Sequence, residues 1–330
     1  MKRPAAYIAG TGRGIPSKAM SNHDFNALGL ETDDQWIVDR TGIKQRYIGN
    51  THETLTWMSV EASKQAMARA GVTAGELDLI VLGTVSPDHL LPSTAVEVQA
   101  ALGATRAAAF DLVAACSGYL YSMSVAENMI QAGSAETVLV IGGEKLSTVV
   151  NWKDRSTCVL FGDGAGACVL RRTRAGGKGI LSTYMRSDGN LAKLLWRPAG
   201  GNTIAATAET IADGSFYVQM AGREVFKHAV RSMSDAFDRA LDQAKITSAE
   251  VDLMIPHQAN LRIIEATAKH AGMSMDKVFV NVDRYGNTSA GSIAIALDEA
   301  IETGRIKEGM TVVLVAFGAG FTWGSVVVRF

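Results

Sequence analysis

The chain has 330 residues, 47% of them hydrophobic and 20% charged, and its formal net charge at pH 7 is −1. This length and apolar content predict a large buried core and about two domains, and the balanced charge gives no indication of a nucleic-acid partner. The three cysteines, Cys116, Cys158 and Cys168, are odd in number and irregularly spaced, so we expect neither a disulfide framework nor a metal site.

Hydrophobic runs are too short to cross a membrane. No apolar stretch approaches the ~18 residues of a membrane helix, and the apolar part of MKRPAAYIAGTGRGIP is too short for a signal peptide. We therefore expect a soluble, cytoplasmic protein without a membrane partner.

In chain order, the first half alternates strand and helix patterns. A strand is expected at 5–9, followed by a glycine turn, and a capped helix is expected at 54–70, with Thr54 before it and Gly71 at its end. An apolar strand ends at Gly83, and an 18-residue helix-like run from Cys116 leads to another strand at 137–142.

The second half repeats this order. After glycine-rich and irregular stretches at 171–179 and 197–214, which we expect on the surface, a helix is predicted over about 216–244. Asp252 aligns with Asp78 at an offset of 174 residues, and a second 18-residue run begins at Asn287 before a strand from Thr311. A duplicated α/β fold is therefore expected, with Cys116 and Asn287 at equivalent points.

Cys116 is a candidate nucleophile. The first turn of a helix exposes unpaired N–H groups and the positive end of the dipole, which lower the pKa of a thiol. The alternative is a small buried hydrophobe, the more common state of a free cysteine, and Cys158 and Cys168 are interpreted that way because they lie in apolar, strand-like runs.

His257 and Asn287 are candidate partners of this thiol. His257 follows a strand and precedes a helical run, a usual position for catalytic groups in α/β folds. Asn287 could instead be only a helix N-cap. If pseudo-symmetry brings the three together, a thiol lies beside two neutral hydrogen-bond donors, which can stabilise an oxyanion formed from a carbonyl.

Other motifs indicate surface or structural roles. The glycine segments 161–166 and 317–324 lack a Walker lysine and are not typical of nucleotide loops. Helical spacing places Arg223, Lys227 and Arg231 on one face, with Arg262 and Lys269 on another helix. Such a stripe is either a solvated face or the binding surface of an acidic macromolecule.

Longer motifs run in a consistent order along nearly the whole chain: DQWIVDRTGIKQRYI (34–48), FDLVAACSGYLYSMSVA around Cys116, FGDGAGA (161–167), AGREVFK (221–227), PHQANLRII around His257, DRYGNTSAGS around Asn287, and AFGAGFTWGSVVVRF at 316–330. Together they resemble β-ketoacyl-acyl-carrier-protein synthase III of the thiolase-like superfamily.

This resemblance implies a thiolase-like, five-layered αβαβα architecture, with halves at 1–175 and 176–330. It also implies a homodimeric acyltransferase that initiates fatty-acid synthesis. The expected reaction is a decarboxylative Claisen condensation of an acyl-CoA primer with malonyl-acyl-carrier protein, without a cofactor.

The resemblance also implies residue roles. Cys116 would carry the acyl group, while His257 and Asn287 would support decarboxylation. The other implied roles are an oxyanion hole from the backbone N–H groups of Cys116 and Ala319, adenine-end CoA binding by Trp36, Arg40 and Arg155, a pantetheine contact at Asn260, and docking of the carrier protein by Lys227 and Arg262.

Two positions depart from the family pattern. The usual all-glycine loop reads Gly318, Ala319, Gly320, and Leu91 stands where relatives often have a phenylalanine contributed by the partner subunit. Together with Leu160 and Phe161, Leu91 is expected to border the acyl pocket. The alternatives are a secondary-metabolism relative with other acyl substrates, a Cys-His-Asn acyl-CoA hydrolase, and a non-catalytic dimer partner.

Overall fold

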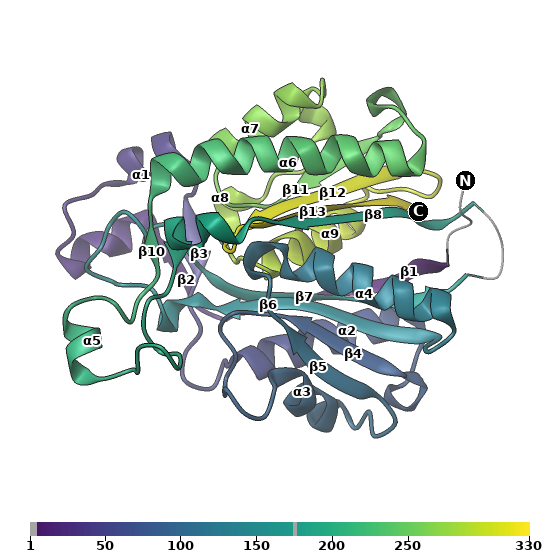
Figure 1. The fold of residues 1–330 in the computed structure, drawn as a ribbon, viewed down its shortest axis with the longest axis horizontal. Helices are drawn as coiled ribbons and strands as arrows, with labels where there is room; N and C mark the ends of the chain where they lie inside the picture. The colour runs from purple at the N-terminus through teal and green to yellow at the C-terminus, as the bar shows by residue number, and fades with distance from the viewer. Residues whose placement is uncertain (1–4, 174–176) are drawn as a thin grey trace.

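The computed structural model describes residues 5–173 and 177–330, and it alternates layers of helix and sheet in the order αβαβα (Figure 1). One sheet has the order β1-β7-β6-β4-β5, and the other has the order β11-β12-β13-β8. The strands of the first sheet are β1 (Ala6–Gly14), β4 (Leu79–Gly83), β5 (Ala108–Leu112), β6 (Thr137–Lys145) and β7 (Asp163–Arg172). Those of the second are β8 (Gly179–Ser187), β11 (Leu253–Pro256), β12 (Thr311–Gly318) and β13 (Thr322–Arg329).

The helices form the other three layers. In Figure 1, α2 and α3 cover the outer face of the first sheet, α6 and α7 cover the outer face of the second, and α4 and α9 lie between the sheets. Their bounds are α2 (Leu55–Ala70), α3 (Thr94–Leu102), α4 (Gly118–Ala132), α6 (Gly222–Ala244), α7 (Leu261–His270) and α9 (Gly291–Glu302). Shorter elements are α1 (Asp34–Thr41), α5 (Ala208–Ala212), α8 (Val282–Tyr285), and the strand pairs β2 (Ala19–Ser21) with β3 (Gln45–Tyr47) and β9 (Leu195–Trp196) with β10 (Gln219–Met220).

The predicted duplication is confirmed by strand pairing. The order β1-β7-β6-β4 runs antiparallel, antiparallel, parallel, and β8-β13-β12-β11 repeats both the order and the directions. Met254 bridges Val278 in parallel on the far side of β11, where the first sheet has β5. The thiolase-like α/β class expected from the sequence is therefore correct.

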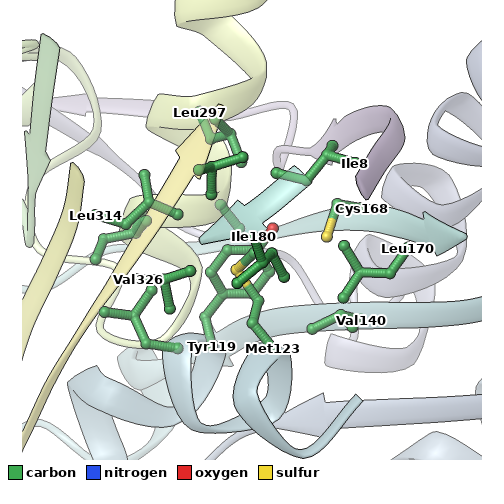
Figure 2. Close-up of a cluster of buried hydrophobic side chains, with 14 of the residues drawn as sticks. Ile8, Tyr119, Met123, Val140, Cys168, Leu170, Ile180, Leu297, Leu314 and Val326 are labelled. Atoms are coloured by element: carbon green, nitrogen blue, oxygen red, sulfur yellow. The ribbon is translucent and has the colours of Figure 1, made fainter. Parts of the chain in front are cut away.

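The central layer holds the main core. Tyr119 and Met123 of α4 meet Leu297 of α9 between Val140 of one sheet and Leu314 of the other, and all five are at most 1% exposed (Figure 2). The start of α9 can approach β6 closely only at a small residue, because a Cβ on Gly142 would lie 2.3 Å from the Ala290 carbonyl oxygen. The glycine in β6 thus lets the start of α9 lie against the sheet.

The two halves do not pack as separate bodies. The expected boundary between residues 175 and 176 falls in 174–176, outside the described residues, although β7 and β8 on either side belong to different sheets. The segment from Met20 to Ile43, early in the first half, packs its apolar side chains into the core of the second half, beside Phe237.

Several element boundaries differ from expectation. Helix α2 begins after Thr54 and ends at Gly71 as predicted, but α6 starts at Gly222 because β10 and its turn occupy the preceding residues. Strand β1 continues to Gly14, and Cys158 lies in a turn instead of a strand-like run. Residues 197–214 form the expected surface loop, with α5 inside it. None of the helices in the described ranges is long and apolar enough to span a bilayer.

Candidate active site

Cys116 lies at the entrance to α4, in the 3₁₀ turn Ala115–Ser117, and is only 9% exposed. The turn is held close to the β12–β13 hairpin, since a Cβ on Gly318 would lie 2.6 Å from the Cys116 backbone nitrogen. Cys158 and Cys168 are fully buried in apolar clusters, in keeping with their predicted structural role.

Cys116 separates two apolar cavities. The first encloses about 700 Å³, including its open mouth, and its lining contains His257, Asn287 and Asn260. The second, of about 670 Å³, extends past Ala115 toward Val149, Trp196 and Arg197. A thiol between two cavities can receive one substrate portion from each side.

His257 follows β11 and is fixed by two hydrogen bonds. Its backbone N–H donates to the Val315 carbonyl at 2.8 Å, and Nδ1 lies 2.6 Å from Ser292 Oγ. The Gln258 N–H donates to the same hydroxyl oxygen, and we assign the hydroxyl hydrogen to Nδ1, which leaves the ring hydrogen on Nε2. Burial lowers the pKa of His257 to about 3, which makes it a neutral donor at neutral pH.

Asn287 is held by its backbone. Its N–H donates to the Leu160 carbonyl at 2.8 Å, and its carbonyl accepts from Gly162 N–H at 3.0 Å. These two hydrogen bonds form an isolated β-bridge between Phe161 and Asn287, which joins the two halves of the chain. The side-chain Oδ1 accepts from Ser289 N–H at 2.8 Å. The amide NH₂ group is therefore the end that Asn287 can offer to a carbonyl in the cavity.

The structure corrects one prediction about these residues and excludes one alternative. Ala115 and Ser289 both have φ 47°, and they are separated by the same 174 residues that relate Thr137 to Thr311. Cys116 is thus equivalent to Ala290 and not to Asn287, although both reach one cavity. Asn287 is also not an N-cap, because α9 begins at Gly291 with Ala290 as its N-cap residue.

The thiol is also less acidic than its helix position predicts. Burial raises the pKa of Cys116 to about 12, the Ser289 hydrogen bond opposes this shift, and the Glu144 carboxylate adds to it. The expectation of a lowered pKa in the resting site is therefore wrong, because desolvation of a buried thiolate outweighs the helix terminus.

The 318–320 loop accommodates its alanine. Gly320 has φ 133°, a conformation suited to glycine, whereas Ala319 is not among the residues with positive φ. Ala319 lines the second cavity and Gly318 lines the first. The departure from an all-glycine loop thus requires no left-handed backbone at Ala319.

The residues predicted to bind the adenine end of CoA lie together and do not line the first cavity. The Arg40 guanidinium carbon is 4.4 Å and that of Arg155 is 5.0 Å from the centroid of the half-buried Trp36 ring. Asn260, which lines the cavity and caps α7, donates to the Arg40 carbonyl at 2.9 Å. Asn260 therefore connects the cavity that contains Cys116 with the segment that carries Trp36 and Arg40.

The remaining predicted residues occupy varied positions. Lys227 and Arg262 are exposed; Lys227 pairs with Glu224 at 2.9 Å, and Arg262 donates to the Asp39 carbonyl.

Leu160 lines the first cavity and Phe161 lines both. Leu91 is 89% exposed and lines neither cavity of the single chain, so a pocket role requires a second copy.

Sequence reasoning missed three polar residues at the site: Ser292, Ser289 and Glu144. Ser292 and Ser289 lie within the motif around Asn287, where they read as helix-start residues. Glu144 was detectable, since a carboxylate directly follows the apolar run TVLVIGG of β6. Among the described residues, no three histidine, cysteine, aspartate or glutamate side chains cluster as metal ligands.

Comparisons with known proteins agree with the geometry. Family models described as 3-oxoacyl-[acyl-carrier-protein] synthase III and its C-terminal region match residues 110–189 and 241–330. The chain is 48% identical over 329 residues to a β-ketoacyl-[acyl-carrier-protein] synthase III of Symbiobacterium thermophilum, covering 100% of this chain and 99% of that one.

Solved structures are similar over the same extent. A 3-oxoacyl-[acyl-carrier-protein] synthase III from Aquifex aeolicus has a TM-score of 0.91 at 46% identity, over 98% of this chain and 100% of that one. A priming β-ketosynthase from the R1128 polyketide pathway has a TM-score of 0.90 at 32% identity, over 99% and 96%.

Proposed function

Because the chain belongs to the β-ketoacyl-acyl-carrier-protein synthase III family, we propose that it condenses an acyl-CoA primer with malonyl-acyl-carrier protein. The observation that carries this proposal is that Cys116, His257 and Asn287 line one cavity, with the histidine neutral. A nucleophile beside two neutral donors suits a reaction that stores an acyl group and then stabilises an enolate.

The first half-reaction is acyl transfer. The Cys116 sulfur attacks the thioester carbonyl, the oxyanion accepts hydrogen bonds from Cys116 and Ala319 N–H, and the carbon–sulfur bond to CoA breaks. The thiol proton leaves with CoA as its free thiol. Trp36, Arg40 and Arg155 hold the adenine end, and Asn260 contacts the pantetheine chain.

The second half-reaction is decarboxylation and condensation. Malonyl-acyl-carrier protein loses CO₂, and the electron pair of the broken bond forms an enolate whose oxygen accepts from His257 Nε2–H and the Asn287 amide. The enolate carbon attacks the acyl carbonyl and expels the Cys116 thiolate, which then takes a proton from solvent. A neutral histidine suits this step because donation, not proton removal, is needed.

A homodimer is part of this proposal. Strand β5 is an edge of its sheet, and Phe110 within it and Val113 just after it are 36% and 77% exposed. An apolar, unpaired strand edge is the kind of surface that a second copy covers by continuing the sheet. Sedimentation should give twice the 35.0 kDa chain mass.

The test is acyl-CoA loading followed by malonyl-acyl-carrier protein. Intact-protein mass spectrometry should show one acyl adduct on Cys116, lost in Cys116→Ala, and the second substrate should release CO₂ and a 3-oxoacyl product. An adduct on Cys158 or Cys168 would overturn the assignment. Free acid from acyl-CoA without condensation would indicate a hydrolase, and a panel of primers identifies the acyl preference.

A further inference from the structure

Glu144, at the end of β6, is a fully buried carboxylate next to the active site. It accepts hydrogen bonds from Val85 N–H at 3.1 Å and from three hydroxyls: Thr84 at 3.0 Å, Ser86 at 2.5 Å and Ser289 at 3.2 Å. These hydrogen-bond partners, all within the described part of the chain, are neutral. A buried carboxylate without a cationic partner is costly, and burial raises the pKa of Glu144 to about 7.

Ser289 joins this carboxylate to the nucleophile. Its hydroxyl donates to Glu144 Oε1 at 3.2 Å, and the residue lines the second cavity beside Cys116, whose pKa its side chain lowers. The residue has φ 47°, which is costly for a serine. The backbone strain thus places one hydroxyl between a thiol and a carboxylate.

The other basic group of the site does not reach the thiol proton in this arrangement. His257 Nδ1 is engaged by Ser292, and its Nε2 carries the ring hydrogen, so the ring has no free acceptor. A buried thiol still has to lose its proton before it attacks a thioester. Ser289 offers a route for this proton, because it lines the second cavity beside Cys116 and donates to the Glu144 carboxylate.

We propose that Ser289 and Glu144 form a proton relay for the acylation of Cys116, which rests on the acyl transfer proposed above. As the sulfur attacks the thioester, the thiol proton passes to Ser289 Oγ while the serine proton passes to Glu144 Oε1. When the carbon–sulfur bond to CoA breaks, the same two transfers run in reverse and the proton leaves on the CoA thiol. Glu144 ends ionised, so no further reactant is consumed.

Alkylation of Cys116 by iodoacetamide at pH 7 tests the relay without using acyl-CoA. In Glu144→Gln the amide keeps a hydrogen bond to Ser289 but cannot take the proton, so we expect alkylation to slow about 100-fold, within the usual range of general-base catalysis. A carboxylate that acts only through its charge disfavours the thiolate, so its removal would speed alkylation. An unchanged or faster rate overturns the proposal.

The matched control is Asp163→Asn. Asp163 is also buried, on neighbouring β7, but its bonds go to Ser147 and Gly49 instead of Ser289. We expect its alkylation rate to stay within about twofold of the parent. Ser289→Ala removes the bridge alone and should match Glu144→Gln, which keeps the proposal testable if the glutamate variant does not fold.

The double variant Ser289→Ala/Glu144→Gln decides whether the two residues act together. If the two residues belong to one relay, the double variant should be alkylated no more slowly than the slower of the two single variants. If they contribute independently, the two decreases in alkylation rate should multiply. Multiplied losses would overturn the relay. Normal alkylation kinetics in a protein that performs no condensation would instead refute the proposed function.

Discussion

At the scale of single residues, the site depends on keeping a histidine uncharged. His257 is 3% exposed, its Nδ1 is bound by a serine hydroxyl, and no carboxylate is among its hydrogen-bond partners in the described structure. Desolvation then favours the neutral ring. A neutral Nε2–H donates to an enolate without protonating its carbon, which is what the condensation requires.

His257→Ala and Asn287→Ala should therefore separate the half-reactions. Each removes one donor to the enolate, worth about 3 kcal/mol by analogy with oxyanion-hole deletions, so CO₂ release should fall roughly 100-fold or more. Radiolabelled acyl loading onto Cys116 should remain near the parent rate and serves as the internal control. If neither variant loads an acyl group, His257 acts as the base for the thiol and the proposed division of roles is wrong.

The buried histidine also predicts a pH effect on stability. Its pKa is about 3 in the folded protein against 6.5 in the unfolded chain, so only the unfolded state binds this proton between these values. The folded state should lose roughly 2 kcal/mol from this group between pH 7.5 and pH 5, or about 3 °C in the thermal midpoint. His257→Asn should show a midpoint decrease smaller by that amount. Equal decreases in both proteins would contradict a depressed pKa.

At the scale of elements, the hairpin between β12 and β13 positions the nucleophile. Gly318, the last residue of β12, lies against the Cys116 backbone nitrogen, while Ala319 in the turn already carries a side chain. The two positions thus tolerate a Cβ very differently.

Gly318→Ala should slow acyl loading of Cys116 by about 100-fold or more, because a Cβ at 2.6 Å from the Cys116 nitrogen forces the oxyanion donor out of place. Ala319→Gly is the matched change in the same loop and should stay within a few-fold of the parent. Rates come from quenched-flow loading, with circular dichroism as the check on folding. Similar rates in both variants would show that the hairpin does not position the donor.

At the scale of the whole molecule, the proposed function assigns exposed surfaces of the chain to a second copy and to the carrier protein. Lys227 of α6 and Arg262 of α7 are exposed in the outer helical layer, and Leu91 and the β5 edge face solvent in the single chain.

Lys227→Glu and Arg262→Glu should raise the Michaelis constant for malonyl-acyl-carrier protein about tenfold at low salt, and less at high salt as the surface charge is screened. Acyl-CoA loading should change little. Lys64→Glu is the matched control, because Lys64 is an exposed lysine in an i,i+3 pair like that of Lys227 but lies on α2 in the opposite outer layer. Equal damage to loading and to the carrier step would contradict a docking role.

Leu91→Phe tests whether the partner copy completes the acyl pocket. A larger side chain should exclude longer primers, and about 1 kcal/mol per methylene group predicts roughly a tenfold shift in the ratio of catalytic efficiencies for acetyl-CoA and octanoyl-CoA. An unchanged ratio would show that Leu91 does not line the pocket. Primer length would then depend on residues of the second cavity.

The order of the elements, the duplication and the main site residues could be predicted from the sequence alone, because local sequence patterns indicate them. Hydrophobic periodicity, caps such as Thr54 with Gly71, and the 174-residue offset between Asp78 and Asp252 predicted the elements and the duplication. Long motifs predicted Cys116, His257 and Asn287, and all three line the first cavity. The starts of α6 at Gly222 and of α9 at Gly291 were harder to predict from the sequence, because pairing with distant segments competes with helix propensity there.

Only the tertiary structure decided the electrostatic state of the site. Whether Cys116 and His257 are charged depends on desolvation by side chains that are remote in sequence, and no spacing rule reports it. The same holds for Ser289, which has a positive φ, donates to Glu144 and lines the second cavity beside Cys116. The sequence determined which groups are present, and the packing of two sheets around α4 and α9 determined their protonation and their partners.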